Sequence, residues 1–466
     1  MFMNLVHRVF NRLSTNQQKV VSNVYWATLG HAVRMLSELF VGILVARYLG
    51  PEQYGLMNYV ITFVTIFSTL AAFGLDHIEV RELAGDKAPK EAVLGTAFLL
   101  RLVFALVTVV IITLTAHAFE ADASARTMIL VYSFSIIFNS FYIIRNYFAA
   151  IVKNKFVVRA EIGRIFVGAI LKVVLLLLRA PLHWFVIAVT FDFVLLASGY
   201  VYAYYSQVGP LREWRFDRNI SSYLIRQSFP LLLSGAAVIV YQRIDQIMLR
   251  NMLSNASAAY FSIADKFATL IMFLPVILSQ TITPLLVRMR AGNPELYRER
   301  RRQFVSTIFW LTMGLSILTC IFSHTLVMLT FGQNYSAAIP VLQVLAFRAV
   351  GMALSATSGQ LIIIESLQKW AFARNLLGCV ACIALNLVLI PRFGAVGSAW
   401  ASIITVAFTG CLANVLIPSY HEVFRLQLQA VATGWREIFC LRRLLSCPPL
   451  ATPSRSAPVN AWKDTL

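Results

Sequence analysis

Long apolar stretches alternate with short polar connections along the whole chain. Each stretch is long enough, at roughly 20 residues, for a helix to cross the hydrocarbon core of a bilayer. They lie at 23–49, 57–83, 93–118, 126–150, 157–179, 181–206, 222–252, 257–287, 304–331, 337–364, 370–391 and 394–418. The pattern predicts an all-α, polytopic membrane protein with about twelve transmembrane helices.

The polar connections divide the chain into parts. One of the longest, QVGPLREWRFDRNIS at 207–221, falls near the middle of the helical region and is predicted to be a cytoplasmic linker. The start of the chain carries one apolar stripe with arginines among its polar positions, as in an interfacial helix. The parts are 1–22, a cytoplasmic interfacial segment; 23–206, an N-terminal six-helix bundle; 222–418, a C-terminal six-helix bundle; and 419–466, a basic cytoplasmic tail that is partly disordered.

The first two helices are joined by a short Gly-Pro turn, and the first of them is not uniformly apolar. His31, Arg34 and Glu38 share one helical face, which cannot point at lipid because a charge at mid-bilayer costs about 3 kcal/mol or more. This face is therefore predicted to line a bundle interior or a wet cavity. The alternative is that Arg34 and Glu38, four residues apart, form a pair that only neutralises itself.

Charge is scarce and unevenly distributed. Hydrophobic residues make up 59% of the chain and charged residues 13%, yet the net charge is +19. The even-numbered loops and the termini hold about 26 Lys and Arg against about 5 in the odd-numbered loops, which predicts that both termini are cytoplasmic. The positive charge is thus a topology signal. Nucleic-acid binding is not indicated, and the arginine cluster at 288–302 could contact anionic membrane lipids.

Motifs of enzymes and metal sites are missing from the sequence. There is no GxxxxGK[ST], G-x-S-x-G or H-E-x-x-H, and the predicted external loops are too short for the catalytic loops of membrane glycan enzymes. Cys379 and Cys382 form a CxxC inside an apolar helix, without a second pair or a histidine to complete four ligands. The chain is therefore predicted not to be an enzyme, to need no cofactor and to hold no metal.

The informative residues are charges inside the apolar stretches, where cations outnumber anions. Arg101, Arg145 and Arg164 lie near helix ends and are expected to snorkel to the interface. Arginines deeper in the spans favour an anionic ligand, because the guanidinium fork suits phosphate. The candidates for such a site are Arg34, Arg226, Arg243 and Arg348.

Three carboxylates are candidates for a coupling-ion site or for structural charge pairs. They are Glu38, Asp245 and Asp265. Asp245 lies two residues after Arg243, and Asp265 directly precedes Lys266, so each could be neutralised by its neighbour in sequence.

Three segments resemble a known family. RYLGPEQYGLMNYV with AAFGLDHIEVRELA resembles the first hairpin of the Wzx-type polysaccharide and O-antigen flippases, which belong to the multidrug, oligosaccharidyl-lipid and polysaccharide (MOP) exporter superfamily. RIDQIMLRNMLSNASAAYFSIADKF resembles their seventh and eighth helices. ALNLVLIPRFGAVGSAWAS resembles their eleventh and twelfth. The last carries the N-x4-P-x2-G-x2-G-x-A arrangement as Asn386, Pro391, Gly394, Gly397 and Ala399.

The resemblance implies two bundles that form a V and alternate between a cytoplasmic and a periplasmic opening. The substrate would be an oligosaccharide repeat unit on undecaprenyl pyrophosphate, flipped across the bacterial inner membrane by ion-coupled antiport. A polysaccharide polymerase and a chain-length regulator would be partners. The chain departs from the family at Ala259-Tyr260, where Gly and Tyr are frequent, and at Arg250, which replaces a small residue.

Three alternatives share parts of this pattern. A drug exporter of the same superfamily has the same helical plan, although its cationic substrates favour an acidic lumen. The superfamily's peptidoglycan-precursor flippase usually has two more helices. A membrane-embedded glycan enzyme is the third alternative.

Overall fold

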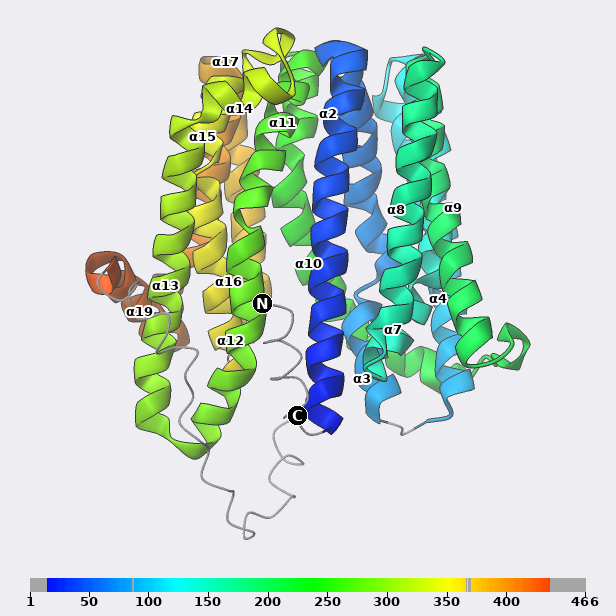
Figure 1. The fold of residues 1–466 in the computed structure, drawn as a ribbon, viewed down its shortest axis with the longest axis vertical. Coiled ribbons are helices and arrows are strands. Elements are labelled where there is room, and N and C mark those ends of the chain that lie inside the picture. The colour runs from blue at the N-terminus through cyan, green and yellow to red at the C-terminus, as the bar shows by residue number, and fades with distance from the viewer. Residues whose placement is uncertain (1–14, 86–87, 366, 368–369, 436–466) are drawn as a thin grey trace, which may run out of the picture.

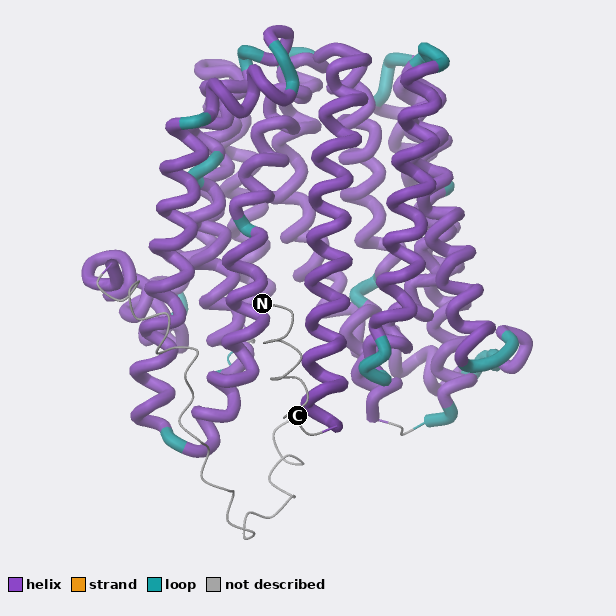
Figure 2. The backbone as a smooth tube through the Cα atoms, in the orientation of Figure 1, coloured by secondary structure: helices purple, strands orange, loops and turns teal. Residues whose placement is uncertain are grey.

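The computed structural model describes residues 15–85, 88–365, 367 and 370–435, and in this part of the chain every regular element is a helix (Figure 2). Of the predicted interfacial segment at 1–22, residues 1–14 lie outside the described residues and the remainder belongs to the first helix; the end of the tail also lies outside. The helices of the N-terminal half are α2 (Thr15–Ala72), α3 (Leu75–Gly85), α4 (Lys90–Phe119), α5 (Ala123–Ser133), α6 (Ser135–Phe138), α7 (Tyr142–Ala150), α8 (Asn154–Leu177) and α9 (Leu182–Gln207).

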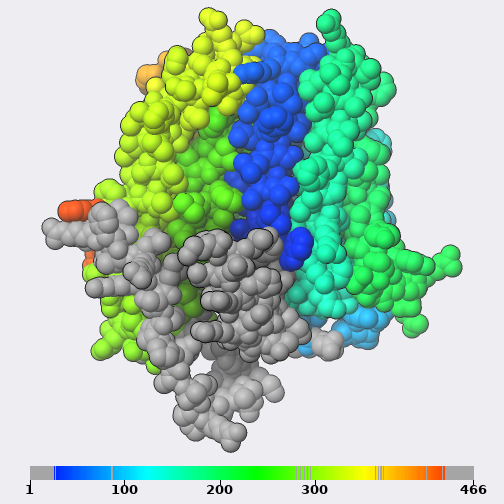
Figure 3. Space-filling model, in the orientation of Figure 1, coloured from blue at the N-terminus to red at the C-terminus, as the bar shows by residue number. Residues whose placement is uncertain are grey.

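The C-terminal half follows after a linker that contains one short 3-10 turn (Leu211–Glu213). Its helices are α10 (Arg218–Met252), α11 (Asn255–Ile271), α12 (Phe273–Gly292), α13 (Pro294–Ile321), α14 (Ser323–Thr330), α15 (Ala338–Leu345), α16 (Arg348–Ile364), α17 (Ala371–Ala407), a π-helical turn (Phe408–Leu412), α18 (Ala413–Leu416) and α19 (His421–Thr433). The helices run up and down the long axis, with the N-terminal half on one side of α2 and most of the C-terminal half on the other (Figures 1 and 3).

The predicted Gly-Pro turn is present within the segment that α2 spans. Gly50 has φ 72° and ψ 172°, a conformation open to glycine but strained for other residues, and Pro51 restarts the helix in the opposite direction. A second break of this kind occurs in α17 at Gly394, with φ 61°. α10 passes Pro230 without interruption, and the predicted eighth helix breaks at Met272, three residues before Pro275.

Nine helices of the described chain are long and apolar enough to cross a membrane. Two of them, Thr28–Gly85 and Phe372–Val415, contain the breaks at Gly50 and Gly394 and so double back. α8 is not among the nine. The fold class is therefore confirmed as helical and membrane-spanning, whereas the count of twelve and the domain limits stay predictions.

Four apolar clusters lie in the described part of the chain, and the three large ones hold most of the helices together. The joint core takes residues from both halves, such as Val60 of α2 and Phe261 of α11. A second core, around Phe304, belongs to the C-terminal half alone. A third, around Phe148, belongs to the N-terminal half together with the first turns of α10. Because one core is shared and two are separate, the halves are tied together mainly where the joint core lies.

Candidate functional site

A cavity of about 440 Å³ lies between the two halves, and we call it the central cavity. Its walls come from α2, α5, α8, α9, α10 and α11, so both halves contribute. The charged residues that line it are Glu38, Arg164, Lys172, Asp192, Arg243, Asp265 and Lys266. Charge at this depth is costly in lipid, and a hydrated cavity between bundles is where such residues are stable.

Two carboxylates of the central cavity are each shared by two cations. Lys172 Nζ donates to Asp192 Oδ2 at 2.5 Å, and Arg164 Nη1 lies 4.0 Å from the same oxygen. Asp192 therefore neutralises only one of its two cations.

Asp265 is arranged in the same way on the other wall. Arg243 Nη1 is 3.5 Å from Asp265 Oδ2, and Arg348 of α16 donates to Asp265 Oδ1. Lys266 does not pair with its neighbour in sequence, because its Nζ donates to the hydroxyl of Tyr54 at 2.5 Å instead. With Arg348 included, five cations face three carboxylates around this cavity.

The structure brings together some predicted residues and separates others. Glu38, Arg243 and Asp265 line the central cavity. Arg348 is not part of the lining, but it donates a hydrogen bond to Asp265. Arg226 is exposed on α10 outside the cavity lining.

Arg34 also lies outside this lining. Its Nη2 contacts His31 Nδ1 at 2.8 Å, and no ion pair with Glu38 is found among the described side chains. His31 in turn stacks on Phe273 of α12 with ring centroids 5.8 Å apart. The face predicted from their helical spacing thus makes contact with the C-terminal half, next to the central cavity.

Asp245 belongs to a different site, buried between α10 and α17. The carboxylate accepts hydrogen bonds from Asn386 Nδ2 at 2.7 Å and from the hydroxyl of Ser402. Cys382 Sγ lies 3.7 Å from Oδ1, and Ser398 donates to Asn386. We call this set the Asp245 cluster.

The suggested pair between Asp245 and Arg243 is wrong. Residues two apart on a helix project about 200° from one another, so Asp245 faces α17 while Arg243 faces the central cavity.

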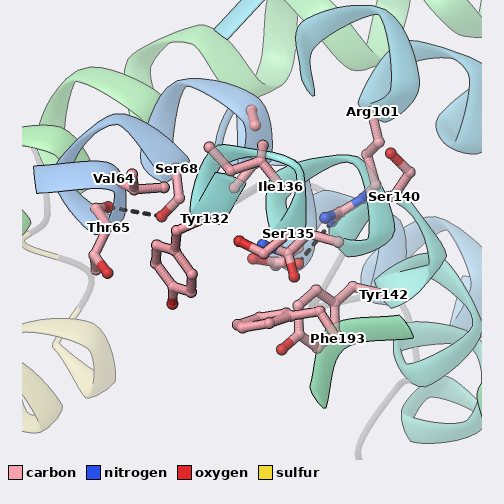
Figure 4. A pocket seen from close by; sticks show the side chains of 14 residues that line it. Val64, Thr65, Ser68, Arg101, Tyr132, Ser135, Ile136, Ser140, Tyr142 and Phe193 are labelled. Atoms are coloured by element: carbon pink, nitrogen blue, oxygen red, sulfur yellow. Dashed lines mark hydrogen bonds and ion pairs between the residues drawn. The ribbon is translucent and has the colours of Figure 1, made fainter. Parts of the chain in front are cut away.

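The expectation that Arg101 snorkels is also wrong. The residue is 3% exposed and donates to Glu79 Oε1 and Oε2, at 2.7 and 2.8 Å, and to Asp76 at 2.6 Å. This network borders a second polar cavity of about 290 Å³ inside the N-terminal half, lined also by Thr65, Ser68 and Tyr132 (Figure 4). Position near a helix end could not reveal carboxylates from another helix.

The halves are closed against each other at the end of the molecule where α2 turns at Gly50, which we call the closed end (Figure 1). Glu120, between α4 and α5, accepts two hydrogen bonds from Arg250 of α10, at 2.5 and 3.0 Å, and one from Tyr59 at 2.9 Å. Tyr335 donates to the carbonyl of Ala46 at 2.7 Å. These bonds join the two halves at the closed end.

Glu120 lies outside the membrane-spanning segments. Burial by itself would raise the pKa of its carboxyl, but the hydrogen bonds from Arg250 and Tyr59 outweigh burial, and the pKa lies below its ordinary range. The ion pair is thus intact at neutral pH.

Sequence reasoning did not select Arg164, Lys172 or Lys266 as site residues. Their signal was the same as that of the selected residues, a cation inside an apolar run. In the part of the chain that the structure describes, no group of three or more His, Cys, Asp or Glu could hold a metal ion.

A family model described as polysaccharide biosynthesis protein matches residues 44–340, from the end of the first helix into α15. The chain belongs to this family. No curated protein gives a significant sequence match.

Solved structures with low sequence identity share the fold of this chain. It is similar to a MATE family multidrug resistance transporter of the MOP superfamily in an inward-facing conformation, with TM-score 0.64, 15% identity, and 88% of this chain and 96% of that chain covered. It is also similar to the lipid II flippase MurJ in an inward closed conformation, with TM-score 0.66, 14% identity and coverage of 89% and 92%.

An outward-facing MATE structure gives a lower TM-score of 0.58 at 14% identity, with coverage of 91% and 96%. The resemblance inferred from the sequence motifs is confirmed for family and fold.

Proposed function

We propose that this protein flips oligosaccharides linked to undecaprenyl pyrophosphate from the cytoplasmic to the periplasmic leaflet of the bacterial inner membrane. The observation that carries the proposal is the cation excess of the central cavity, five against three, in a member of a polysaccharide biosynthesis family. The negative charge of a pyrophosphate group balances the surplus of cations, and arginine binds phosphoryl oxygens through its planar fork.

Arg243, Arg348, Arg164 and Lys172 are the proposed pyrophosphate ligands. Each pair already shares one carboxylate, so a phosphoryl group can bind the second cation of the pair without removing the carboxylate from the first. Arg34 and Arg226 remain predicted contacts on the route toward the cavity, since α2 and α10 both continue beyond it.

The Asp245 cluster is the proposed coupling site for a proton or a sodium ion. It offers a fully buried carboxylate surrounded by neutral hydroxyl and amide groups, with no cation bonded to it among the described residues. Asp245 and Arg243 are two residues apart on α10, so a movement of α10 that follows ion binding reaches the central cavity directly. Glu38 and Asp265 stay with the substrate cavity in this proposal.

The proposed orientation follows the distribution of positive charge, which puts both termini in the cytoplasm and the closed end in the periplasm. The structure is then closed to the periplasm, in keeping with its higher similarity to inward-facing than to outward-facing relatives. Contacts with a polysaccharide polymerase and a chain-length regulator stay predictions.

The test is translocation of a fluorescent polyprenyl-pyrophosphate oligosaccharide by the purified protein in proteoliposomes, with and without a proton or sodium gradient. We expect gradient-dependent flipping, reduced at least tenfold by Arg243→Ala and unchanged by Arg392→Ala, which removes an exposed arginine of α17 outside the cavity. Efflux of a cationic dye without flipping would identify a drug exporter instead. Chemical conversion of the glycan would identify an enzyme.

A separate variant tests the coupling site. Asp245→Asn keeps the size of the side chain but removes the charge that binds a cation, and it leaves one acceptor oxygen where Asn386 and Ser402 now use two. We expect flipping that no longer responds to the gradient. Full gradient dependence in this variant would exclude Asp245 as the coupling residue.

A further inference from the structure

A second cavity of the C-terminal half, about 290 Å³ in volume, contains two buried arginines. It lies between α10, α16 and α17, and we call it the arginine pocket. Its polar lining consists of Tyr241, Gln242, Arg348, Ser355, Arg374, Asn375 and Ser402, and the remainder is apolar.

Both arginines have donors without a partner. Arg374 is 8% exposed, and neither its Nε nor its Nη1 makes a hydrogen bond within the described structure. Arg348 is 6% exposed; one of its terminal nitrogens binds Asp265, but its Nε makes no hydrogen bond there. Three guanidinium nitrogens of two residues that line one cavity therefore have no hydrogen-bond partner in the described structure.

This arrangement is costly unless an anion is bound. A buried unpaired charge costs several kcal/mol, and arginine cannot escape the cost by losing its proton because its pKa exceeds about 12. No carboxylate forms an ion pair with Arg374 among the residues that the structure describes, since Asp245 is bonded to Asn386 and Ser402, and Asp265 to Arg348 and Arg243. The described residues thus supply no counter-charge to Arg374.

We infer that the arginine pocket binds one compact anion, a halide or a phosphoryl group, between the guanidinium groups of Arg374 and Arg348. The volume corresponds to about ten water molecules at 30 Å³ each, which admits such an ion with part of its hydration but not a sugar chain. The hydroxyl of Tyr241 and the amide of Gln242 are further donors in the wall.

The pocket connects the two sites of the proposed transport cycle, although its ion does not depend on that function. Arg348 forms the boundary to the central cavity through Asp265, and Ser402 belongs both to the pocket lining and to the Asp245 cluster. An anion on Arg348 weakens the hold of this arginine on Asp265. Binding of the anion thereby releases a carboxylate toward Arg243 in the central cavity.

The test uses the thermal stability of the full-length protein purified in detergent, at constant sodium concentration, in sodium gluconate, chloride, phosphate or pyrophosphate. Gluconate spreads its single charge over a bulky, weakly coordinating anion and serves as the reference. A ligand of the folded state raises Tm by about 2 °C per tenfold increase in its concentration above Kd for a chain of this size. We expect such a rise for at least one of the three compact anions.

Arg374→Met is expected to remove this dependence and, in gluconate, to have a higher Tm than the unsubstituted protein, because the uncompensated charge is gone. Arg392→Met, at the other end of the same helix segment and exposed, should keep the dependence. Arg374→Lys retains the charge without the fork and should keep a weaker dependence, which guards against misfolding of the methionine variant.

The anion arms identify the source of the ion. A rise in chloride or phosphate that Arg374→Met abolishes assigns the pocket to a free inorganic ion, and a rise in pyrophosphate alone that Arg374→Met abolishes assigns it to a diphosphate. Equal Tm in all four salts, or an undiminished anion effect in Arg374→Met, would overturn the inference. Neither result bears on flipping, so the proposed function stands or fails by its own assay.

Discussion

The ion pair at the closed end offers a direct test of how the two halves are held together. Glu120 bonds both terminal nitrogens of Arg250, accepts a third bond from Tyr59, and is 6% exposed. Glu120→Ala removes all of these bonds and leaves Arg250 without its carboxylate, although its guanidinium keeps its place 4.2 Å from the ring of Tyr59. Among the described residues, Glu120 is the only carboxylate that bonds α10 to the N-terminal half at the closed end. The substitution removes this bridge.

The magnitude follows from burial. Removing one partner of a fully buried pair costs about 3–5 kcal/mol. The Arg250 side chain is 15% exposed and retains its aromatic contact, so the lower limit of about 3 kcal/mol applies. A conformation that is open at this end exposes both groups to water and loses little. The substitution therefore shifts the ratio of open to closed molecules by a factor of about 100.

The assay is labelling of a cysteine placed in the joint core. Ala259→Cys on α11 puts a small thiol at a fully buried position, in a background without the six native cysteines. A membrane-impermeant maleimide reacts only when the closed end opens. We expect Glu120→Ala to speed labelling by about 100-fold, and Glu91→Ala, which breaks a partly exposed pair with Lys90 at 3.7 Å, to leave the rate unchanged. An unaltered rate in Glu120→Ala would refute the reasoning.

Three further predictions use the same structure. The lowered pKa of Glu120 means that its contribution to the closed state is fully present above the ordinary carboxyl range and is lost as the pH falls through the pKa of the closed state. The labelling rate, divided at each pH by that of an exposed cysteine to correct for the loss of reactive thiolate, should therefore stay constant from pH 8 to about 5 and rise only in stronger acid. Gly55→Ala places a Cβ 1.8 Å from a backbone carbonyl of α11 and should speed labelling at least tenfold, whereas Gly235→Ala, with open space around it, should not; equal rates would contradict the close packing. Glu79→Gln removes a fully buried carboxylate from the arginine of α4 and should lower Tm by about 5 °C, against less than about 1 °C for the exposed pair at Glu82→Gln.

Much of the candidate site follows from the sequence only as a set of residue types. Arg243, Asp265 and Arg348 were each recognisable as charges inside apolar runs, yet they come from α10, α11 and α16, and nothing local indicates that one carboxylate joins both arginines. For Arg164, the environment suggested by the sequence differs from the one in the structure. Its place near a helix end favoured snorkelling, but the orientation of α8 turns it toward Asp192 of α9 in the central cavity.

The sequence alone determined the elements and their membrane character, because helix formation and insertion depend on runs of neighbouring apolar residues and on local signals such as Gly50-Pro51. It also determined the family, through motifs that are continuous along the chain. The tertiary structure alone decided how each helix is rotated about its axis and which helices are neighbours. Those two properties place Asp245 against α17, Glu120 against Arg250 and Arg374 in the wall of the arginine pocket. A charge meets its partner only where helices distant in the sequence pack together.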